Sequence, residues 1–228
     1  RLVSLPSPSS RVINIIAVGK NGACLASINM VHWFSLMLPV QEDILSITSY
    51  ENTVICGTDA GKILRSTNRG NSWRVISSGV LSALYQIEFI DQTTVIGTTS
   101  QGKIVRSTDS GNTWNTVFEN EDLYNLNDLF FVDSLRGYFV GVDYEAHGLI
   151  YKTTNSGLNW FSLNSRTSNT LNSVFFTGSE TGYAAGHYGT IIKTTNGGGE
   201  PIGIEPISNI IPNEFRLYQN YPNPFNPV

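Results

Sequence analysis

Ser66-Thr67-Asn68-Arg69-Gly70-Asn71-Ser72-Trp73 is the first complete copy of a phrase that recurs along this 228-residue chain. The later copies are Ser107-Thr108-Asp109-Ser110-Gly111-Asn112-Thr113-Trp114, Thr153-Thr154-Asn155-Ser156-Gly157-Leu158-Asn159-Trp160 and a shortened Thr194-Thr195-Asn196-Gly197-Gly198. The third position of the phrase, Asn or Asp, recurs after 41, 46 and 41 residues. A period of this length is typical of proteins built from stacked structural repeats.

Each repeat contains four short stretches rich in β-branched and aromatic residues, bounded by Gly, Asn, Asp or Ser. Four short strands per repeat predict an all-β protein, a β-propeller of four-stranded antiparallel blades with about five blades. The innermost strands are expected at residues 44–50, 84–90, 126–132 and 171–176.

The phrase itself is expected to form the turn into the last strand of each blade. Asn or Asp accepts hydrogen bonds from amides further along the turn, Gly allows a positive φ, and Trp covers the turn with an apolar face. A structural role is favoured over catalysis because the motif recurs once per blade. The predicted structural residues are Ser66, Asn68, Gly70, Trp73, Ser107, Asp109, Gly111, Trp114, Thr153, Asn155, Gly157, Trp160, Thr194 and Asn196.

A basic residue stands immediately before each copy of the phrase: Arg65, Arg106, Lys152 and Lys193. These side chains could form a basic stripe, but solvated charges at the blade edges are the favoured interpretation.

The phrase resembles the Asp-box, or BNR repeat, whose pattern is Ser/Thr-x-Asp-x-Gly-x-Thr-Trp. This repeat occurs in sialidases, in other glycosidase propellers and in the photosystem II stability and assembly factor propellers. Gly61-Lys62-Ile63-Leu64-Arg65 and Gly102-Lys103-Ile104-Val105-Arg106, which precede the first two copies, look most like the last group. The resemblance covers roughly residues 12–197 and implies a propeller. From the assembly factors it also implies the binding of a partner.

The two ends of the repeat region are less regular. A degenerate first copy, Ser27-Ile28-Asn29-Met30-Val31-His32-Trp33, lacks the glycine. The last copy has no Trp and no evident fourth strand. Residues 1–5 resemble the fourth strand at residues 74–78, so we expect them to complete the last blade and close the ring. The alternative is that they end a preceding blade. The propeller is therefore assigned to residues 1–196 and a linker to residues 197–213.

The C-terminal residues 214–228 contain Leu217-Tyr218-Gln219-Asn220-Tyr221-Pro222-Asn223-Pro224-Phe225-Asn226-Pro227. This string resembles the opening of the type A sorting domain of the type IX secretion system, of which only the first segment is present. The resemblance implies a parent protein that the secretion machinery exports, and a location outside the cell or on the outer-membrane surface of a Gram-negative bacterium.

Charge, hydropathy and cysteine content disfavour several classes of partner and site. The net charge of −4 does not favour nucleic acid as a partner, and no apolar run reaches membrane-spanning length. No cofactor is indicated, and a metal site from loop His and Asp residues is disfavoured. Cys24 and Cys56 fall in neighbouring blades, where a disulfide is conceivable, but buried free thiols are favoured.

If the repeated turns mark one face of the propeller, the loops between second and third strands lie on the other. Function tends to be grafted onto such loops, and the loop at residues 143–147 departs most from the repeat. The predicted binding residues are Asp59, Gln101, Tyr124, Asp143, Tyr144, Glu145, His147, His187 and Tyr188.

These residues predict a binding or scaffold module that recognises polysaccharide or protein, and the resemblance of the C-terminal string implies that this module is secreted or on the cell surface. The alternative is a polysaccharide-degrading glycoside hydrolase, with Asp143 and Glu145 as catalytic candidates. Sialidase activity is disfavoured because no Arg-Ile-Pro precedes the first full repeat, and Arg11 and Arg136 lack that context.

Overall fold

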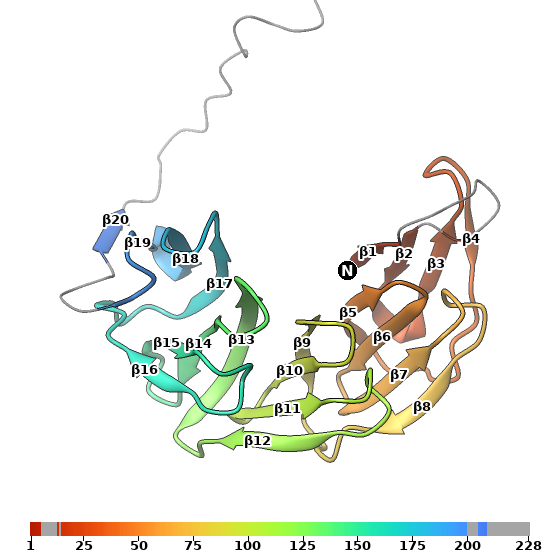
Figure 1. The fold of residues 1–228 in the computed structure, drawn as a ribbon, viewed down its shortest axis with the longest axis horizontal. Coiled ribbons are helices and arrows are strands. Elements are labelled where there is room, and N and C mark those ends of the chain that lie inside the picture. The colour runs from red at the N-terminus through yellow and green to blue at the C-terminus, as the bar shows by residue number, and fades with distance from the viewer. Residues whose placement is uncertain (6–12, 14, 200–204, 209–228) are drawn as a thin grey trace, which may run out of the picture.

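The computed structural model describes residues 1–5, 13, 15–199 and 205–208. Within these residues, twenty strands form five four-stranded antiparallel sheets. Each sheet consists of four strands that follow one another in the sequence. The sheets succeed one another around an arc, with the first strand of each sheet toward the inside and the fourth toward the outside (Figure 1). We call each sheet a blade and number the blades in chain order.

Blade 1 comprises β1 (Leu2–Ser4), β2 (Ile15–Val18), β3 (Cys24–Ser27) and β4 (Trp33–Ser35), with the short 3-10 helix η1 (Lys20–Gly22) between β2 and β3. Blade 2 comprises β5 (Ile44–Tyr50), β6 (Thr53–Thr58), β7 (Lys62–Ser66) and β8 (Arg74–Ser77). Blade 3 comprises β9 (Leu84–Phe89), β10 (Val95–Thr99), β11 (Lys103–Ser107) and β12 (Asn115–Glu119). Blade 4 comprises β13 (Leu123–Phe131), β14 (Gly137–Asp143), β15 (Gly148–Thr153) and β16 (Phe161–Leu163). Blade 5 comprises β17 (Leu171–Phe176), β18 (Gly182–Gly186), η2 (His187–Gly189), β19 (Ile191–Thr194) and β20 (Glu205–Ser208).

The apolar core lies between the blades. Four clusters of buried side chains fill the four junctions between consecutive blades. The middle strands of blades 2 to 4 are therefore largely buried on both faces, as in β6, whose sequence Thr-Val-Ile-Cys-Gly-Thr is continuously apolar or small. The outer strand β8 has no neighbour beyond it and stays largely exposed. All four predicted innermost strands are confirmed, with small shifts of their ends.

The prediction for the chain ends was wrong. β1 does not complete the last blade: it pairs with β2 and is the innermost strand of blade 1. The fourth strand of blade 5 is instead β20, which pairs with β19 and comes from the segment expected to be linker. The arc is accordingly open between β1 and β17 (Figure 1). The residues that resemble a sorting domain lie outside the described part of the chain.

The repeated turns have one hydrogen-bond pattern. In the second full copy, Ser107 Oγ donates to Asp109 Oδ1 at 2.8 Å and accepts from the Gly111 amide at 2.8 Å. Asp109 Oδ1 also accepts from the Thr113 amide at 2.8 Å. The Trp114 indole donates to the Gly111 carbonyl at 3.0 Å. The equivalent Ser/Thr-to-Asn and amide bonds recur at Ser66, Thr153 and Thr194.

For three of the four basic residues before the turns, the prediction of solvated edge charges was wrong. Arg65 Nε donates to the Ser110 carbonyl at 2.7 Å, and Arg106 Nε donates to the Ser156 carbonyl at 3.0 Å. Lys152 Nζ donates to the Gly197 carbonyl at 2.7 Å. Each acceptor is the fourth residue of the repeated turn in the next blade, so these bonds link consecutive blades.

The two cysteines are free and buried, as the favoured interpretation predicted. They belong to the cluster between blades 1 and 2. Burial raises the pKa of Cys24 to about 11 and raises that of Cys56 as well, so both stay protonated as small apolar side chains. Among the described residues, no helix has the length and apolar character needed to cross a membrane.

Candidate functional site

The antiparallel order of the strands separates the turns into two faces. The repeated turns join third to fourth strands on one face, which we call the turn face. The connections from second to third strands, and from each fourth strand to the next blade, lie on the opposite face, which we call the loop face. The predicted binding residues all lie in, or at the edge of, loop-face connections.

An exposed pair of aromatic rings stands on the loop face of blade 4. The rings of Tyr124 and Tyr144 are 5.3 Å apart between centroids, with planes inclined by 55°. Both side chains are exposed. Gln101 is held at a φ of 72° beside them, and its amide donates to the Tyr124 carbonyl at 2.6 Å. Exposed tyrosines offer a flat apolar surface with a polar edge, which suits recognition of a ligand.

Asp143 fixes the loop that carries Tyr144. Its Oδ1 accepts from the amides of Glu145 at 2.9 Å and His147 at 2.8 Å. Its Oδ2 lies 3.1 Å from His147 Nδ1. Partial burial opposes ionisation, but these hydrogen bonds outweigh it and lower the pKa of Asp143. Asp143 is therefore an ionised acceptor that shapes the loop.

Glu145 completes a small polar group around the same imidazole. Its Oε2 lies 3.7 Å from His147 Nδ1, the atom that Asp143 also contacts. The two carboxylates therefore converge on one side chain of their own loop and do not face each other across a cleft. We call Tyr124, Asp143, Tyr144, Glu145 and His147 the loop cluster.

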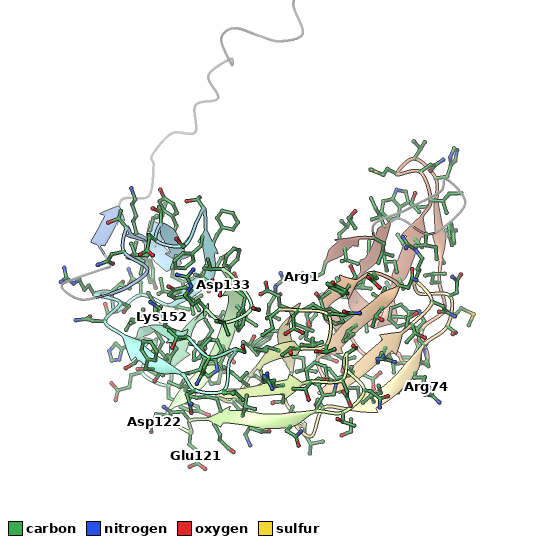
Figure 2. All side chains as sticks on the ribbon, viewed as in Figure 1. Arg1, Arg74, Glu121, Asp122, Asp133 and Lys152 are labelled. Atoms are coloured by element: carbon green, nitrogen blue, oxygen red, sulfur yellow. The ribbon has the colours of Figure 1, made fainter. Side chains whose placement is uncertain are left out.

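The remaining predicted residues lie on other blades. Asp59 is exposed in the β6–β7 turn, where its amide donates to the Asp43 carbonyl at 3.0 Å. His187 and Tyr188 form η2 in blade 5, and Tyr188 has a φ of 54°. The hydrogen bonds and ring contacts of the described residues do not join these three to the loop cluster. The acids Glu121 and Asp122 of the β12–β13 connection point outward at the rim of the arc (Figure 2).

Metal ligation is not supported by these positions. In the described ranges of the chain, no three His, Cys, Asp or Glu side chains gather closely enough to hold a metal ion. A small apolar pocket does exist, but it lies between blades 4 and 5 and is lined by residues such as Tyr138, Leu163 and Phe176. None of its lining residues belongs to the loop cluster.

The sequence did not single out Glu88, a titratable residue with an altered pKa. Glu88 lies partly buried on the innermost strand β9, where burial and the nearby Asp128 raise its pKa to about 8, although the Phe131 amide lowers it. A single acid within an otherwise uncharged strand, Leu-Tyr-Gln-Ile-Glu-Phe, was the available signal.

Solved structures with a similar fold are known. No family model matches the sequence, and no curated protein matches it either. A structure of YCF48 bound to a D1 peptide is similar over 85% of this chain and 66% of its own, with 18% identity and a TM-score of 0.64. YCF48 from Cyanidioschyzon merolae is similar over 90% of this chain and 74% of its own, with 12% identity and a TM-score of 0.67.

The fold is a β-propeller. A xyloglucanase of family GH74 from Xanthomonas campestris is also similar, over 85% of this chain and 36% of its own, with 14% identity and a TM-score of 0.64. At these identities the similarity establishes the architecture alone. This propeller spans about two thirds of the length of the peptide-bound YCF48 chain.

Proposed function

We propose that this propeller is a secreted or cell-surface binding module that recognises a segment of a partner protein, or a polysaccharide, through the loop cluster. The observation that carries the proposal is the exposed Tyr124–Tyr144 ring pair beside an ionised Asp143. Aromatic rings supply contact area at a low entropic cost, and the neighbouring acid and imidazole supply oriented hydrogen bonds.

A protein segment is the favoured ligand. One structural neighbour, YCF48, was solved with a peptide bound, which shows that this architecture can present a peptide-binding surface. The loop cluster fits such a ligand because its carboxylates can accept from backbone amides or from basic side chains. The same rings would also stack on sugar faces, so polysaccharide remains the second ligand class.

The repeated turns and the C-terminal residues support two further parts of the proposal, the repeat family and the location of the protein. We propose that the repeated turns make the chain an Asp-box propeller, since their Ser/Thr, Asn/Asp and Gly positions share one bonding pattern. The string at residues 215–227 supports export by the type IX secretion machinery to the surface of a Gram-negative bacterium.

Binding can be tested with an array of overlapping peptides from surface proteins and a panel of soluble polysaccharides. We expect Tyr124→Ala and Tyr144→Ala each to weaken capture by about tenfold or more, as for aromatic residues at interface centres. Tyr50→Ala is the matched control, because Tyr50 forms a similar ring pair with Phe89 at the other end of the innermost strands. Equal losses in all three variants would contradict the proposed site.

The alternative, a polysaccharide-degrading hydrolase, rests on Asp143 and Glu145. Their convergence on His147 gives it less support, because glycosidases place their two carboxylates on either side of the scissile bond. Reducing-sugar release that disappears in both Asp143→Asn and Glu145→Gln would replace the binding proposal with this one.

A further inference from the structure

The junction between blades 4 and 5 shows what a complete interface in this propeller contains. Neighbouring strands of blade 4 place Phe130, Tyr138, Val140, Ile150 and Lys152 on one face, as the pairs Phe130↔Tyr138↔Lys152 and Val140↔Ile150 show. Blade 5 covers this face with the row Val174↔Ala184↔Ile192. The apolar side chains among them belong to one buried cluster, against which Phe130 packs partly buried.

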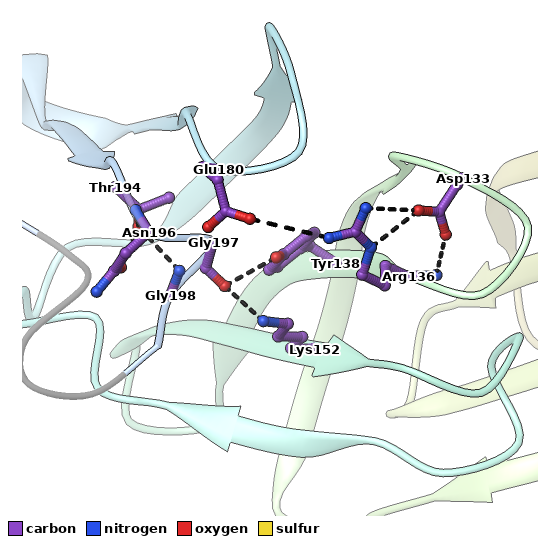
Figure 3. Close-up of polar contacts among 9 residues, drawn as sticks. All are labelled: Asp133, Arg136, Tyr138, Lys152, Glu180, Thr194, Asn196, Gly197 and Gly198. Atoms are coloured by element: carbon purple, nitrogen blue, oxygen red, sulfur yellow. Dashed lines mark hydrogen bonds and ion pairs between the residues drawn. The ribbon is translucent and has the colours of Figure 1, made fainter.

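A polar clamp fixes the same junction. Tyr138 Oη and Lys152 Nζ both donate to the carbonyl of Gly197, at 2.8 Å and 2.7 Å (Figure 3). Lys152 Nζ also lies 5.5 Å from the centre of the Tyr138 ring. Gly197 is the fourth residue of the blade 5 turn and has a φ of 62°.

Blade 5 repeats the donor face on its far side. The pairs Phe175↔Tyr183↔Lys193 and Ala185↔Ile191 occupy the positions of Phe130, Tyr138, Lys152, Val140 and Ile150. Here the face is open: Phe175 is 55% exposed and Ile191 is 41% exposed. Lys193 Nζ lies 5.7 Å from the centre of the Tyr183 ring, but neither side chain hydrogen-bonds to any described residue.

Blade 1 presents the complementary face at the other end of the arc. The row Leu2↔Ala17↔Leu25 occupies the positions of Val174, Ala184 and Ile192. Leu2 is 58% exposed and Leu25 is 43% exposed. Met30, the fourth residue of the degenerate turn, has a φ of 62° like Gly197, and its carbonyl is the acceptor equivalent to the one that the clamp holds.

We propose that the open face of blade 5 binds blade 1 of a second copy of this chain, head to tail. The two faces reproduce, row by row, the apolar surfaces that are buried between blades 4 and 5. The Tyr183–Lys193 clamp would hold the Met30 carbonyl of the second copy. Because the two faces differ, the contact is heterologous, and copies join into a ring or a chain of propellers.

The mass in solution tests the proposal. We expect the 25.1 kDa chain to give, by light scattering, at least twice its mass in a concentration-dependent manner. Phe175→Asp on blade 5 and Leu25→Asp on blade 1 should each give monomers, since each places a charge in the apolar junction. Leu81→Asp is the matched control at an exposed loop leucine and should assemble like the parent chain.

Mixing the two monomeric variants is the decisive experiment. Leu25→Asp keeps an intact blade 5 face and Phe175→Asp keeps an intact blade 1 face, so the mixture should form a heterodimer and stop at two copies. Lys193→Met should weaken assembly about tenfold through loss of one charge-assisted bond, whereas Lys62→Met should not. A parent chain that stays monomeric at its highest soluble concentration, or variants that stay monomeric when mixed, would overturn the proposal. Circular dichroism and thermal unfolding would confirm that each variant is folded.

Discussion

The turn face of the propeller is regular from blade to blade, whereas the loop face varies. On the turn face, the same hydroxyl, amide and glycine positions recur from blade to blade with nearly the same bonds, as at Gly70, Gly111 and Gly157. On the loop face, the connections differ in length and composition. Among the connections that the structure describes, only residues 143–147 combine an acid turn, an imidazole and an exposed ring.

This difference separates the residues that maintain the fold from those available for recognition. The turn face satisfies most of its polar groups internally, with the buried Trp73 indole nitrogen as an exception, and buries its glycines against the preceding blade. The loop face leaves Tyr124 and Tyr144 uncovered. Substitutions on the turn face should therefore change stability, whereas those in the loop cluster should change binding and leave stability nearly unaltered.

The largest effect is expected at Gly111. A Cβ there would collide with Ile55 Cδ1 of blade 2, and the residue has a φ of 82°. Gly111→Ala should lower the free energy of unfolding by about 2–4 kcal/mol, from overpacking combined with backbone strain. Denaturant unfolding measures this value.

Gly79→Ala is the matched control, because Gly79 has a φ of 83° but nothing within 4 Å of an added Cβ. Its cost should be the backbone strain alone, about 1 kcal/mol. If both substitutions cost the same, the turn glycines do not act through packing between blades.

Much of the fold could be predicted from the sequence because each repeat contains the residues that form its own turn. The Asn, Gly and Trp of the phrase fix where each turn lies, and the spacing fixes the number of strands. The position of residues 1–5 was not readable in this way. A short amphipathic strand carries no mark of its partner, and the sheet that β1 joins is decided by contacts with β2 and the blade 2 core.

The sequence predicted which residues belong to the candidate site better than it predicted how those residues contact one another. The sequence singled out the loop at residues 143–147, but not that Asp143 would accept from the backbone of its own loop. The linking role of Arg65 and Arg106 was also missed, because their acceptors are backbone carbonyls of another blade, which no side-chain pattern reveals.

The innermost strand β9 carries a carboxyl group, that of Glu88, whose burial opposes its ionisation. Glu88 has a pKa of about 8 in the folded protein, against an ordinary value of 4.5. The folded state therefore holds a proton that the unfolded state releases, so stability falls as the pH rises from 4.5 to about 8. Glu88→Gln should remove this slope and stabilise the protein by about 2 kcal/mol at pH 8. Thermal unfolding between pH 5 and 8 would measure it, and parallel curves for both proteins would contradict the assignment.

The smallest effect is expected at Asp109, where the turn face stabilises a charge. Burial opposes ionisation, but hydrogen bonds from Thr113, Ser107 and Asn112 lower the pKa of Asp109 to about 2, below the ordinary 3.8. This stabilisation is complete above pH 3.8 and is lost as the pH falls toward 2. Because the side chain is exposed, solvent screening reduces it to about 1 kcal/mol.

Asp109→Asn should therefore cost about 1 kcal/mol at pH 7 and nothing near pH 2, with the turn intact because Asn68 and Asn155 form it elsewhere. The reverse substitution Asn155→Asp should gain stability at pH 7 and lose that gain in acid. Chemical denaturation at pH 7 and pH 2 would measure both. An Asp109→Asn cost that persists at pH 2 would mean that the carboxylate acts through shape and not through charge, and that the turn face distinguishes Asp from Asn at this blade alone.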